Sequence, residues 1–274
     1  MALTGELRTL AEGLDHPEGV CWSPGTGSIY AGGEAGQIYR VQLDGGFEQV
    51  AQVKGGFILG LAVDADDVIY ACDGNGQHVM RIDLRDGGAP QPYGDAMIYP
   101  NYPAFDADGN LWVSDSGDWQ AANGALCKIS PGGGRTERVL EGLDFANGVA
   151  VDDEHVYVIE TNRPGVVRVP LGGGHADEVV ELPRTVPDGL AFDGDGGLWI
   201  SLYEPHSVLR MGRDGAVETA LDDWTGLEIT SPTNVAFAGD DLSVLVLASL
   251  SGWAVKAIDA GVRGRKLHYP ELKT

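Results

Sequence analysis

Four side-chain oxygen donors occupy the same position of a pattern that recurs along the chain. Each copy has a short apolar strand, an Asp/Gly turn and a second strand, as residues 186–200 illustrate. The residue just before the first apolar pair of each first strand is, in the six copies, Glu18, Leu59, Asn101, Asn147, Asp188 and Thr233. If the copies surround one axis, two carboxylates and two amides meet there, and all-oxygen ligation favours Ca²⁺, or Mg²⁺ or Mn²⁺, over zinc or copper. The pattern therefore predicts one central divalent cation, which would also relieve the repulsion between the carboxylates.

The same residues have a simpler interpretation as turns. Asn-Gly and Asp-Gly are common turn dipeptides, and one such pair alone indicates a turn. Here the polar residue precedes an apolar strand instead of joining two hairpin strands, and it recurs in phase. Both features favour the cation site. The later pairs Asp108-Gly109 and Asp195-Gly196 follow the strand, so we assign them to turns.

The elements that must position these residues are short strands. Apolar and aromatic runs alternate with Gly/Asp/Asn turns and no long segment has helical periodicity, which indicates an all-β protein. Each copy holds four strands and spans about 40–45 residues, which is typical of a β-propeller. The six predicted blades cover about 14–54, 55–95, 96–142, 143–184, 185–224 and 226–260.

The two ends of the repeat complement each other. The last copy lacks a clear fourth strand, and an unpaired strand, Gly5–Leu10, precedes the first copy. We expect this strand to complete the last blade and close the ring, which leaves no open strand edge. Residues 261–274 are then expected outside the ring. Because the repeat runs without a linker, residues 1–274 are interpreted as one domain.

Charge and composition narrow the partners. The chain of 274 residues has 41 acidic and 18 basic side chains and a net charge of -23, which excludes nucleic acid and anionic membranes as expected partners. No apolar run is long enough to span a membrane, and the N-terminus lacks the apolar core of a signal peptide. Cys21, Cys72 and Cys127 are far apart, as expected of reduced thiols. We expect a cytoplasmic protein, monomeric or weakly homo-oligomeric, that acts on a small molecule.

Four segments resemble those of the family of gluconolactonase, regucalcin (senescence marker protein) and luciferin-regenerating enzyme. They are His16–Gly19, Asn101–Gly109, Ala146–Ala150 and Pro187–Ala191. The resemblance covers essentially the whole chain and implies a six-bladed propeller. It also implies one divalent cation, Ca²⁺ first, with Mg²⁺, Mn²⁺ or Zn²⁺ as alternatives. The implied ligands are Glu18, Asn147 and Asp188, with Asn101 as a fourth ring member that contacts the substrate or a water on the metal.

The same resemblance implies metal-assisted hydrolysis of a lactone. Asp188 would act as general base on the attacking water, with Asn101 as its catalytic partner. Sugar-lactone members carry an arginine and an aspartate where this chain has Tyr99 and Tyr102. We therefore expect a lactone or ester less polar than gluconolactone, bound by these two tyrosines. Three residues on loops at the channel mouth are further candidates for the walls of the substrate pocket: Trp119, Tyr203 and His206.

Other functions fit the same fold. A phosphotriesterase-like hydrolase would use a similar metal ring, and a lyase or isomerase would share the scaffold. A strictosidine-synthase-like propeller works without metal, and the intact oxygen ring argues against it. A non-enzymatic binding propeller is the remaining alternative. The absence of Gly-x-Ser-x-Gly excludes an α/β-hydrolase triad. Most acidic residues that follow the second strands, among them Asp73, Asp115 and Glu160, are expected to be solvated.

Overall fold

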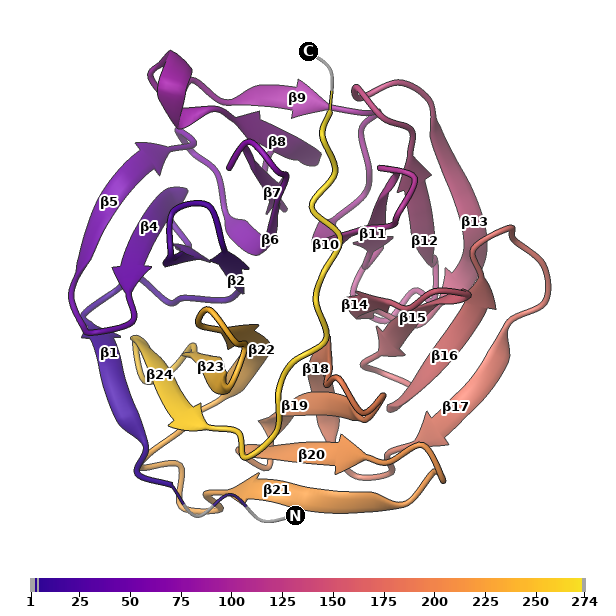
Figure 1. Ribbon diagram of the computed structural model, residues 1–274. Coiled ribbons are helices and arrows are strands. Elements are labelled where there is room, and N and C mark those ends of the chain that lie inside the picture. Colours follow the sequence, from indigo (N-terminus) through magenta and orange to yellow (C-terminus); the bar gives the residue numbers. More distant parts are fainter. Residues whose placement is uncertain (1–2, 4, 273–274) are drawn as a thin grey trace.

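The computed structural model describes residue 3 and residues 5–272, and these residues form β-strands almost throughout. Six four-stranded antiparallel sheets surround a central channel (Figure 1). The expected all-β, six-bladed propeller is therefore confirmed. The one helix in the described part of the chain is the short η1 (Leu84–Asp86), which connects the two outer strands of the second blade.

In the first five blades the strands follow one another in sequence from the channel outward, and in the sixth the N-terminal strand is the outermost. The first three blades consist of β2 (Val20–Ser23), β3 (Ser28–Gly32), β4 (Gln37–Gln42) and β5 (Phe47–Gln52); β6 (Ile58–Val63), β7 (Ile69–Asp73), β8 (His78–Ile82) and β9 (Gln91–Tyr93); and β10 (Pro100–Phe105), β11 (Leu111–Asp115), β12 (Gly124–Ile129) and β13 (Thr136–Leu143). The last three consist of β14 (Ala146–Val151), β15 (His155–Glu160), β16 (Gly165–Pro170) and β17 (Asp177–Glu181); β18 (Val186–Phe192), β19 (Leu198–Glu204), β20 (Ser207–Met211) and β21 (Val217–Asp222); and β22 (Pro232–Ala238), β23 (Val244–Ser249) and β24 (Ala254–Asp259) with β1 (Arg8–Glu12).

The N-terminal strand closes the ring as expected, but at a shifted position. β1 pairs antiparallel with β24 and forms the outer edge of the sixth blade. It covers Arg8–Glu12 instead of Gly5–Leu10, because Leu10 and Ala11 are the residues that bury their side chains in the core between the sixth and first blades. Gly5 stays exposed.

The hairpin after the innermost strand is an Asp-centred turn. In the third blade, one carboxylate oxygen of Asp106 accepts the backbone N–H groups of Asp108 and Asn110, and the other accepts the indole N–H of the fully buried Trp112 at 2.8 Å. Gly109 supplies the left-handed residue of the turn, with φ of 81°. This structure confirms the assignment of Asp108-Gly109 to a turn and shows why the turn packs so close to the core.

The innermost strands of blades two to six share an irregular register at one place. In β10, Pro100 pairs with Asp115, but the next pair is Pro103 with Val113, so that Asn101 stands in a β-bulge. Shifts at the equivalent place of the other four strands enclose Leu59, Asn147, Asp188 and Thr233. A bulge bends its strand and redirects side chains. The backbone therefore fixes the phase at which the candidate ligands occur.

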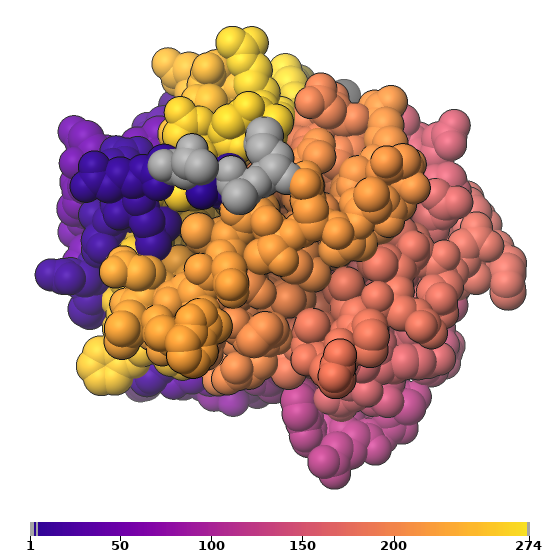
Figure 2. All heavy atoms as spheres, turned by 90° about the horizontal axis from the view of Figure 1, so that it is seen from below, coloured from indigo at the N-terminus to yellow at the C-terminus, as the bar shows by residue number. Residues whose placement is uncertain are grey.

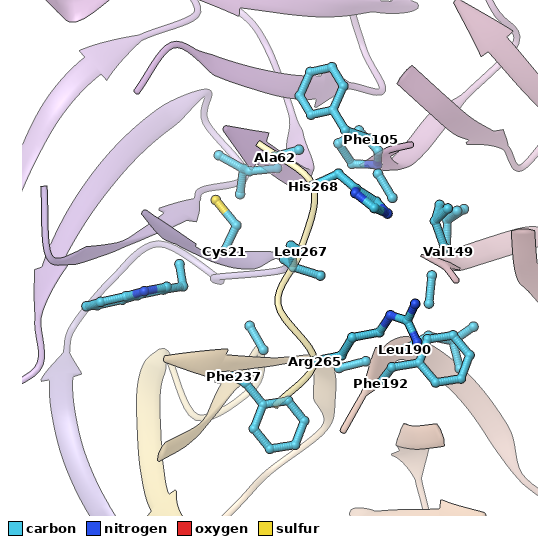
Figure 3. A pocket seen from close by; sticks show the side chains of 18 of the residues that line it. Cys21, Ala62, Phe105, Val149, Leu190, Phe192, Phe237, Arg265, Leu267 and His268 are labelled. Carbon is cyan, nitrogen blue, oxygen red and sulfur yellow. The ribbon is translucent and has the colours of Figure 1, made fainter. Parts of the chain in front are cut away.

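The expectation that the C-terminal segment lies outside the ring was wrong. The segment crosses one end of the channel (Figure 1). Arg265 N donates to Phe192 O at 2.9 Å, and the hydroxyl of Tyr269 donates to Trp22 O at 3.1 Å. Under the segment lies a cavity of about 80 Å³ lined by apolar side chains of the innermost strands (Figure 3). The segment covers apolar surface that the inner strands would otherwise leave in water.

The two faces of the propeller thus differ. We call the face crossed by the C-terminal segment the tail face, and the opposite face, where the innermost strands begin, the mouth face. In the side view the yellow C-terminal segment lies on the tail face, and magenta loops of the third blade protrude from the mouth face (Figure 2). Within the described residues, no helix is long and apolar enough to cross a membrane.

Candidate functional site

The four predicted oxygen ligands lie where the innermost strands begin, at the mouth face. Asn101 and Asn147 are the second residues of β10 and β14, and Asp188 is the third residue of β18. Glu18 lies two residues before the start of β2. The exposed fractions of Asn101, Asn147 and Asp188 are 4%, 5% and 8%, and Glu18 is half-buried. Polar side chains this deep in a protein require partners.

The two carboxylates act on each other and on the amide between them. Burial raises the pKa of Asp188 well above its usual range; the negative charge of Glu18 adds to this shift, and a hydrogen bond with Asn147 opposes it. Burial, with the charge of Glu34, raises the pKa of Glu18 to about 8. Carboxylates in such a place are stabilised in their charged form by a nearby positive charge. The structure therefore brings Glu18, Asn147 and Asp188 together, as the sequence predicted.

Two hydroxyl groups hold the asparagines and link neighbouring blades. Asn101 Nδ2 donates to Ser116 Oγ at 3.1 Å, and this hydroxyl donates to the carbonyl oxygen of Ala146 at 2.6 Å. Ala146 directly precedes Asn147. Because the amide nitrogen is engaged with the hydroxyl, the amide oxygen Oδ1 is the atom left for another partner.

The same arrangement recurs one blade further along. Asn147 Nδ2 donates to Thr161 Oγ1 at 3.2 Å, and this hydroxyl donates to the carbonyl oxygen of Pro187, next to Asp188, at 2.9 Å. Sequence reasoning missed both hydroxyls. The signal was available, because Ser116 and Thr161 each directly follow the second strand of their blade.

Glu18 and Asp188 are held through the backbone. The hydroxyl of Thr233 donates to Glu18 O at 2.7 Å and so joins the sixth blade to the first. Gly148 allows the fourth and fifth blades to approach, because a Cβ atom at this position would lie 2.5 Å from Asp188 O. Side-chain hydroxyls and a close backbone contact thus set the spacing between ring residues, as outer partners commonly do around metal sites.

The donor set fits a hard divalent cation. Two carboxylates supply negative charge, and two amides have their nitrogen atoms bound elsewhere and their oxygen atoms available. Oxygen donors of this kind suit Ca²⁺ and, with more water in the shell, Mg²⁺. The carboxylates that would bind it have raised pKa values, which a cation would lower. The roles of Glu18, Asn101, Asn147 and Asp188 as ligands stay a prediction.

The two tyrosines lie on different sides of the ring. Burial and the charges of Glu18, Glu34 and Asp73 raise the pKa of Tyr99 to about 12, which places its phenol beside the carboxylates at the mouth. The hydroxyl of Tyr102 instead donates across the channel to Asn234 Oδ1 at 3.2 Å, and its ring lines the cavity on the tail side. Tyr102 therefore belongs to the floor under the ring, whereas Tyr99 belongs to the mouth.

Of the three candidate wall residues, Trp119 and His206 lie on mouth-face loops and Tyr203 lies in a strand. Trp119 is 58% exposed and packs edge-on against Phe145, with ring centroids 4.5 Å apart. Tyr203 is half-buried near the end of β19. His206 Nδ1 accepts the backbone N–H of Ser231 at 3.0 Å, so this ring connects two loops. Substrate contact by Trp119, Tyr203 and His206 stays a prediction.

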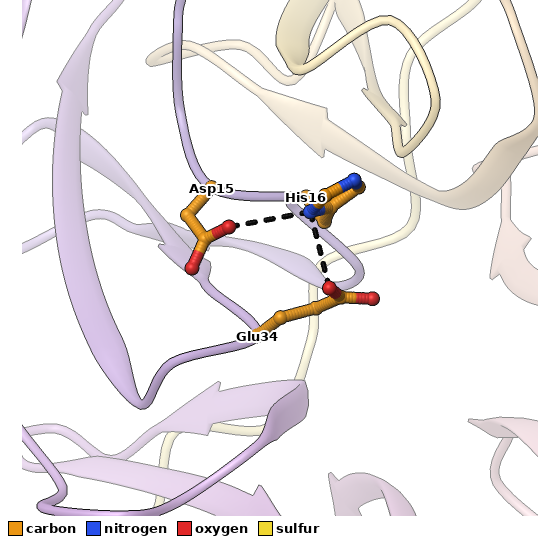
Figure 4. A group of neighbouring side chains, drawn as sticks. All are labelled: Asp15, His16 and Glu34. Atoms are coloured by element: carbon orange, nitrogen blue, oxygen red, sulfur yellow. Dashed lines mark hydrogen bonds and ion pairs between the residues drawn. The ribbon is translucent and has the colours of Figure 1, made fainter.

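Sequence reasoning missed the grouping of Asp15, His16 and Glu34 (Figure 4). The charge of Glu34 acts on Glu18, so the group borders the ring. His16 Nδ1 lies 3.2 Å from Asp15 Oδ1 and 3.1 Å from Glu34 Oε2. The other oxygen of Asp15 accepts N–H groups of Ala35 and Gln37, which fixes that carboxylate. Ligand atoms of the three residues lie within 4.8 Å of one another, a spacing that hydrogen bonds from His16 also explain. The position of His16, two residues before Glu18, was the available signal.

The acidic residues at the ends of the second strands are not solvated as expected. Asp73, Asp115 and Glu160 are buried, and each accepts a backbone N–H from the segment that leads into the innermost strand of its own blade. Asp115, for example, accepts from Tyr99 at 2.8 Å. The expectation was wrong because free backbone N–H groups of a buried loop require acceptors.

Comparison with known proteins agrees with this architecture. The chain is 28% identical to 6-deoxy-6-sulfogluconolactonase of Pseudomonas putida over 72% of its length, which is just under two thirds (66%) of that protein. It is 25% identical to pentonolactonase XacC of Haloferax volcanii over 86% of its length and 81% of that protein. Because these identities are low, the activities in the two names are stated of the relatives alone.

Comparison with solved structures and with family models identifies the fold and the family. The solved structure of regucalcin, a calcium-binding protein from Agrobacterium tumefaciens, superposes with a TM-score of 0.81 at 17% identity, covering 100% of this chain and 99% of that one. Residues 17–251 match the model of the SMP-30/Gluconolactonase/LRE-like region. This match includes all four ring residues, the first five blades and the two inner strands of the sixth, and the chain belongs to the SMP-30/gluconolactonase/LRE-like family.

Proposed function

We propose that the protein is a lactone hydrolase that depends on one divalent cation, with Ca²⁺ the first candidate. The observation that carries the proposal is the group of one buried and one half-buried carboxylate with two oriented amides at the mouth of the channel. Glu18 and Asp188 lie in each other's field, and the relays through Ser116 and Thr161 leave the amide oxygens available. Two relatives named as lactonases support the reaction class.

The reaction requires a water, a proton acceptor and a stabilised carbonyl oxygen. When bound, the cation supplies a Lewis acid that polarises the carbonyl and stabilises negative charge on its oxygen. Asp188 would take the proton of the attacking water as the new bond to the carbonyl carbon forms. The ring C–O bond then breaks, and the ring oxygen leaves as an alcohol after receiving this proton, so that water and lactone give a hydroxy acid.

Glu18, Asn101 and Asn147 have a different task in this scheme. Glu18 offers a second carboxylate but is joined to the sixth blade through Thr233, which holds it at the ring. Asn101 and Asn147 have their amide orientation set by Ser116 and Thr161. We assign the binding of the cation to these three residues together with Asp188, which also serves as the base, and we assign to Asn101 an additional contact with the substrate.

A pH-indicator assay of lactone opening tests the proposal. γ- and δ-lactones, aliphatic, aromatic and sugar-derived, are offered to calcium-loaded and EDTA-treated protein. We expect turnover that is lost with EDTA and returns with calcium. In Asp188→Asn we expect a loss of about 10²–10⁴-fold in kcat, the usual contribution of a positioned base.

Two results would contradict the proposal. If calorimetry shows stoichiometric calcium binding but no lactone is opened, the lactonase activity is wrong. Turnover of phosphotriesters under the same conditions would then support the phosphotriesterase alternative. If no divalent cation binds to the protein, the interpretation of the ring is itself wrong. Asp44→Asn serves as a matched control, because it removes an exposed carboxylate between β4 and β5, outside the proposed ligand set.

A further inference from the structure

A second set of equivalent residues stands just outside the ring. Two positions before the ring residues, the six copies carry His16, Phe57, Tyr99, Phe145, Val186 and Ser231. In three consecutive blades this residue is aromatic: Phe57, Tyr99 and Phe145 are all half-buried. Half-buried aromatic side chains at the mouth of a channel provide apolar surface to a ligand.

Hydrogen bonds show that these three aromatic residues are structurally equivalent. The carbonyl oxygens of Phe57, Tyr99 and Phe145 each accept the backbone N–H of the residue that follows the second strand of the same blade. The distances are 3.0 Å, 2.9 Å and 3.1 Å. Each residue is thus fixed by the same bond to its own blade, and the three follow one another around the mouth. We call Phe57, Tyr99, Phe145 and the adjoining Trp119 the aromatic arc.

The loop that carries Trp119 is built onto Tyr99. The fully buried Asp115 accepts backbone N–H groups from Tyr99 at 2.8 Å and from Gly117 at 3.2 Å. Asp118 N donates to Asn123 Oδ1 at 2.8 Å, which closes the loop. Because the loop is fixed at both ends, little further conformational entropy of the loop is lost when a ligand binds to its exposed tryptophan.

Trp119 extends the arc outward. Its ring packs on Phe145 with centroids 4.5 Å apart and an angle of 75° between the planes, while 58% of the side chain stays exposed. Exposed apolar surface next to a candidate site indicates a surface that a ligand covers.

The opposite side of the mouth is different. Trp253 is 53% exposed and packs edge-on against His16 at 5.2 Å. His16 lies between the carboxylates of Asp15 and Glu34. The surroundings of Trp253 are therefore charged and polar, whereas Trp119 packs on an apolar ring. Glu18 belongs to the same first blade as His16, whereas Trp119 belongs to the third blade and Phe145 leads into the fourth. Tyr99 is the member of the arc that lies near the acidic side, because the charges of Glu18 and Glu34 act on its phenol.

We propose that the substrate is a lactone with an apolar alkyl or aryl substituent, and that this substituent lies on the aromatic arc of the second to fourth blades. The inference rests on the proposed function, because the lactone carbonyl has to be held at the ring. When the carbonyl is held at the ring, an apolar substituent can extend either over the aromatic arc or over the opposite side with His16 and Trp253. The outer part of the aromatic arc, Trp119 and Phe145, offers this substituent apolar contacts in place of water, whereas the side around His16 would require charged groups to leave solvent.

A homologous substrate series tests this inference quantitatively. γ-Butyrolactones with γ-alkyl chains from methyl to hexyl are compared by kcat/KM. Complete burial of one methylene corresponds to about fourfold in kcat/KM, and burial of half its surface to about twofold. We expect an increase of about twofold to fourfold per methylene in the wild-type protein, and a nearly flat series in Trp119→Ala.

Trp253→Ala is the matched control, since both tryptophans are exposed to a similar degree and both pack edge-on against a residue two positions before a ring residue. It should keep the slope of the wild type. Trp119→Leu, with melting temperatures of all variants, guards against loss of the fold and should keep part of the slope.

The outcomes separate the two proposals. If the wild type opens lactones but the series is flat, or if both tryptophan variants lose the slope equally, the assignment to the aromatic arc is wrong and the lactonase proposal stands. If no lactone is opened by any variant, the proposed function fails and this inference fails with it.

Discussion

Thr161 stands between the side chain of Asn147 and the backbone of the next blade. Its Oγ1 accepts from Asn147 Nδ2 at 3.2 Å and donates to Pro187 O at 2.9 Å. Since Pro187 directly precedes Asp188, one hydroxyl ties together two residues of the proposed cation site that come from different blades. The precision of the site therefore depends on groups that would not touch the cation.

Replacement of this hydroxyl should weaken cation binding. In Thr161→Val the amide of Asn147 loses one of its two partners, the hydroxyl, and keeps only its hydrogen bond with Asp188. Loss of such outer partners typically lowers metal affinity by about 10–100-fold, and we expect a decrease of this size in calcium affinity by calorimetry. Thr219→Val, at an exposed position of β21, is the control. An affinity equal to that of the wild type would show that the relay does not orient Asn147.

The stability of the cation-free protein should fall as pH rises. The pKa of Glu18 is raised from an ordinary value of 4.5 to about 8, so between these values the folded state binds more protons than the unfolded state. The stability is thus greatest below the unfolded pKa and decreases toward the folded pKa, and the raised pKa of Asp188 acts in the same direction.

Thermal unfolding at several pH values measures this effect. From about pH 5 to about pH 8 we expect the melting temperature of EDTA-treated protein to fall more steeply than that of calcium-loaded protein. Glu18→Gln, which cannot ionise, should reduce the slope of the EDTA-treated sample. Parallel curves for the loaded and treated samples would argue against charge crowding at the ring.

A methyl group at Gly148 should disturb the contact between the fourth and fifth blades. The added Cβ would lie 2.5 Å from Asp188 O, a backbone atom that cannot move alone. Overpacking of this kind costs about 1–3 kcal/mol, and we expect a lower melting temperature together with reduced activity. Gly172→Ala is the control, because a Cβ there meets no atom within 4 Å. Equal losses in both variants would contradict a specific role of the blade contact.

The buried Asp115 should be required for the loop that carries Trp119. Its carboxylate accepts backbone N–H groups of Tyr99 and Gly117 and pairs with Arg138 at 2.9 Å. Asp115→Ala leaves these donors without an acceptor, at a cost of about 3–5 kcal/mol, or about 2–4 °C in melting temperature for each kcal/mol. Limited proteolysis should cut residues 116–123 faster than in the wild type, whereas the exposed Asp118→Asn should change the rate little. An unchanged rate in Asp115→Ala would show that the loop is held elsewhere.

The sequence predicted most of the fold because each blade is a local meander. Short Asp/Gly segments predict its turns, as Asp106 and Gly109 show, and apolar runs predict its strands. The bounds of β1 and the path of the C-terminal segment were not predicted correctly. Both depend on partners from the far end of the chain, such as β24 for Ala11 and Trp22 for Tyr269.

The equivalence of Asn101, Asn147 and Asp188 was also predicted from their common position in the repeat. In the structure all three stand in the same kind of bulge. What could not be predicted are the partners that hold them. The hydroxyl of Ser116 donates to a carbonyl of the next blade, and Asp115 is acidic but buried. Composition and local pattern would place such polar residues in solvent, and only the complete set of contacts shows why they are inside.

The pairing of β1 with β24 makes every blade an interior unit. In an open repeat array the end units have one neighbour each and fray first. Here the strand that opens the chain is the outer edge of the last sheet, so loosening it breaks the circle and lets the sixth blade move away from the first. Glu18 and Thr233 stand on the two sides of that seam. A substitution in β1, on the outer rim, is thereby coupled to the distance between groups at the centre, and the seam is where the channel can widen.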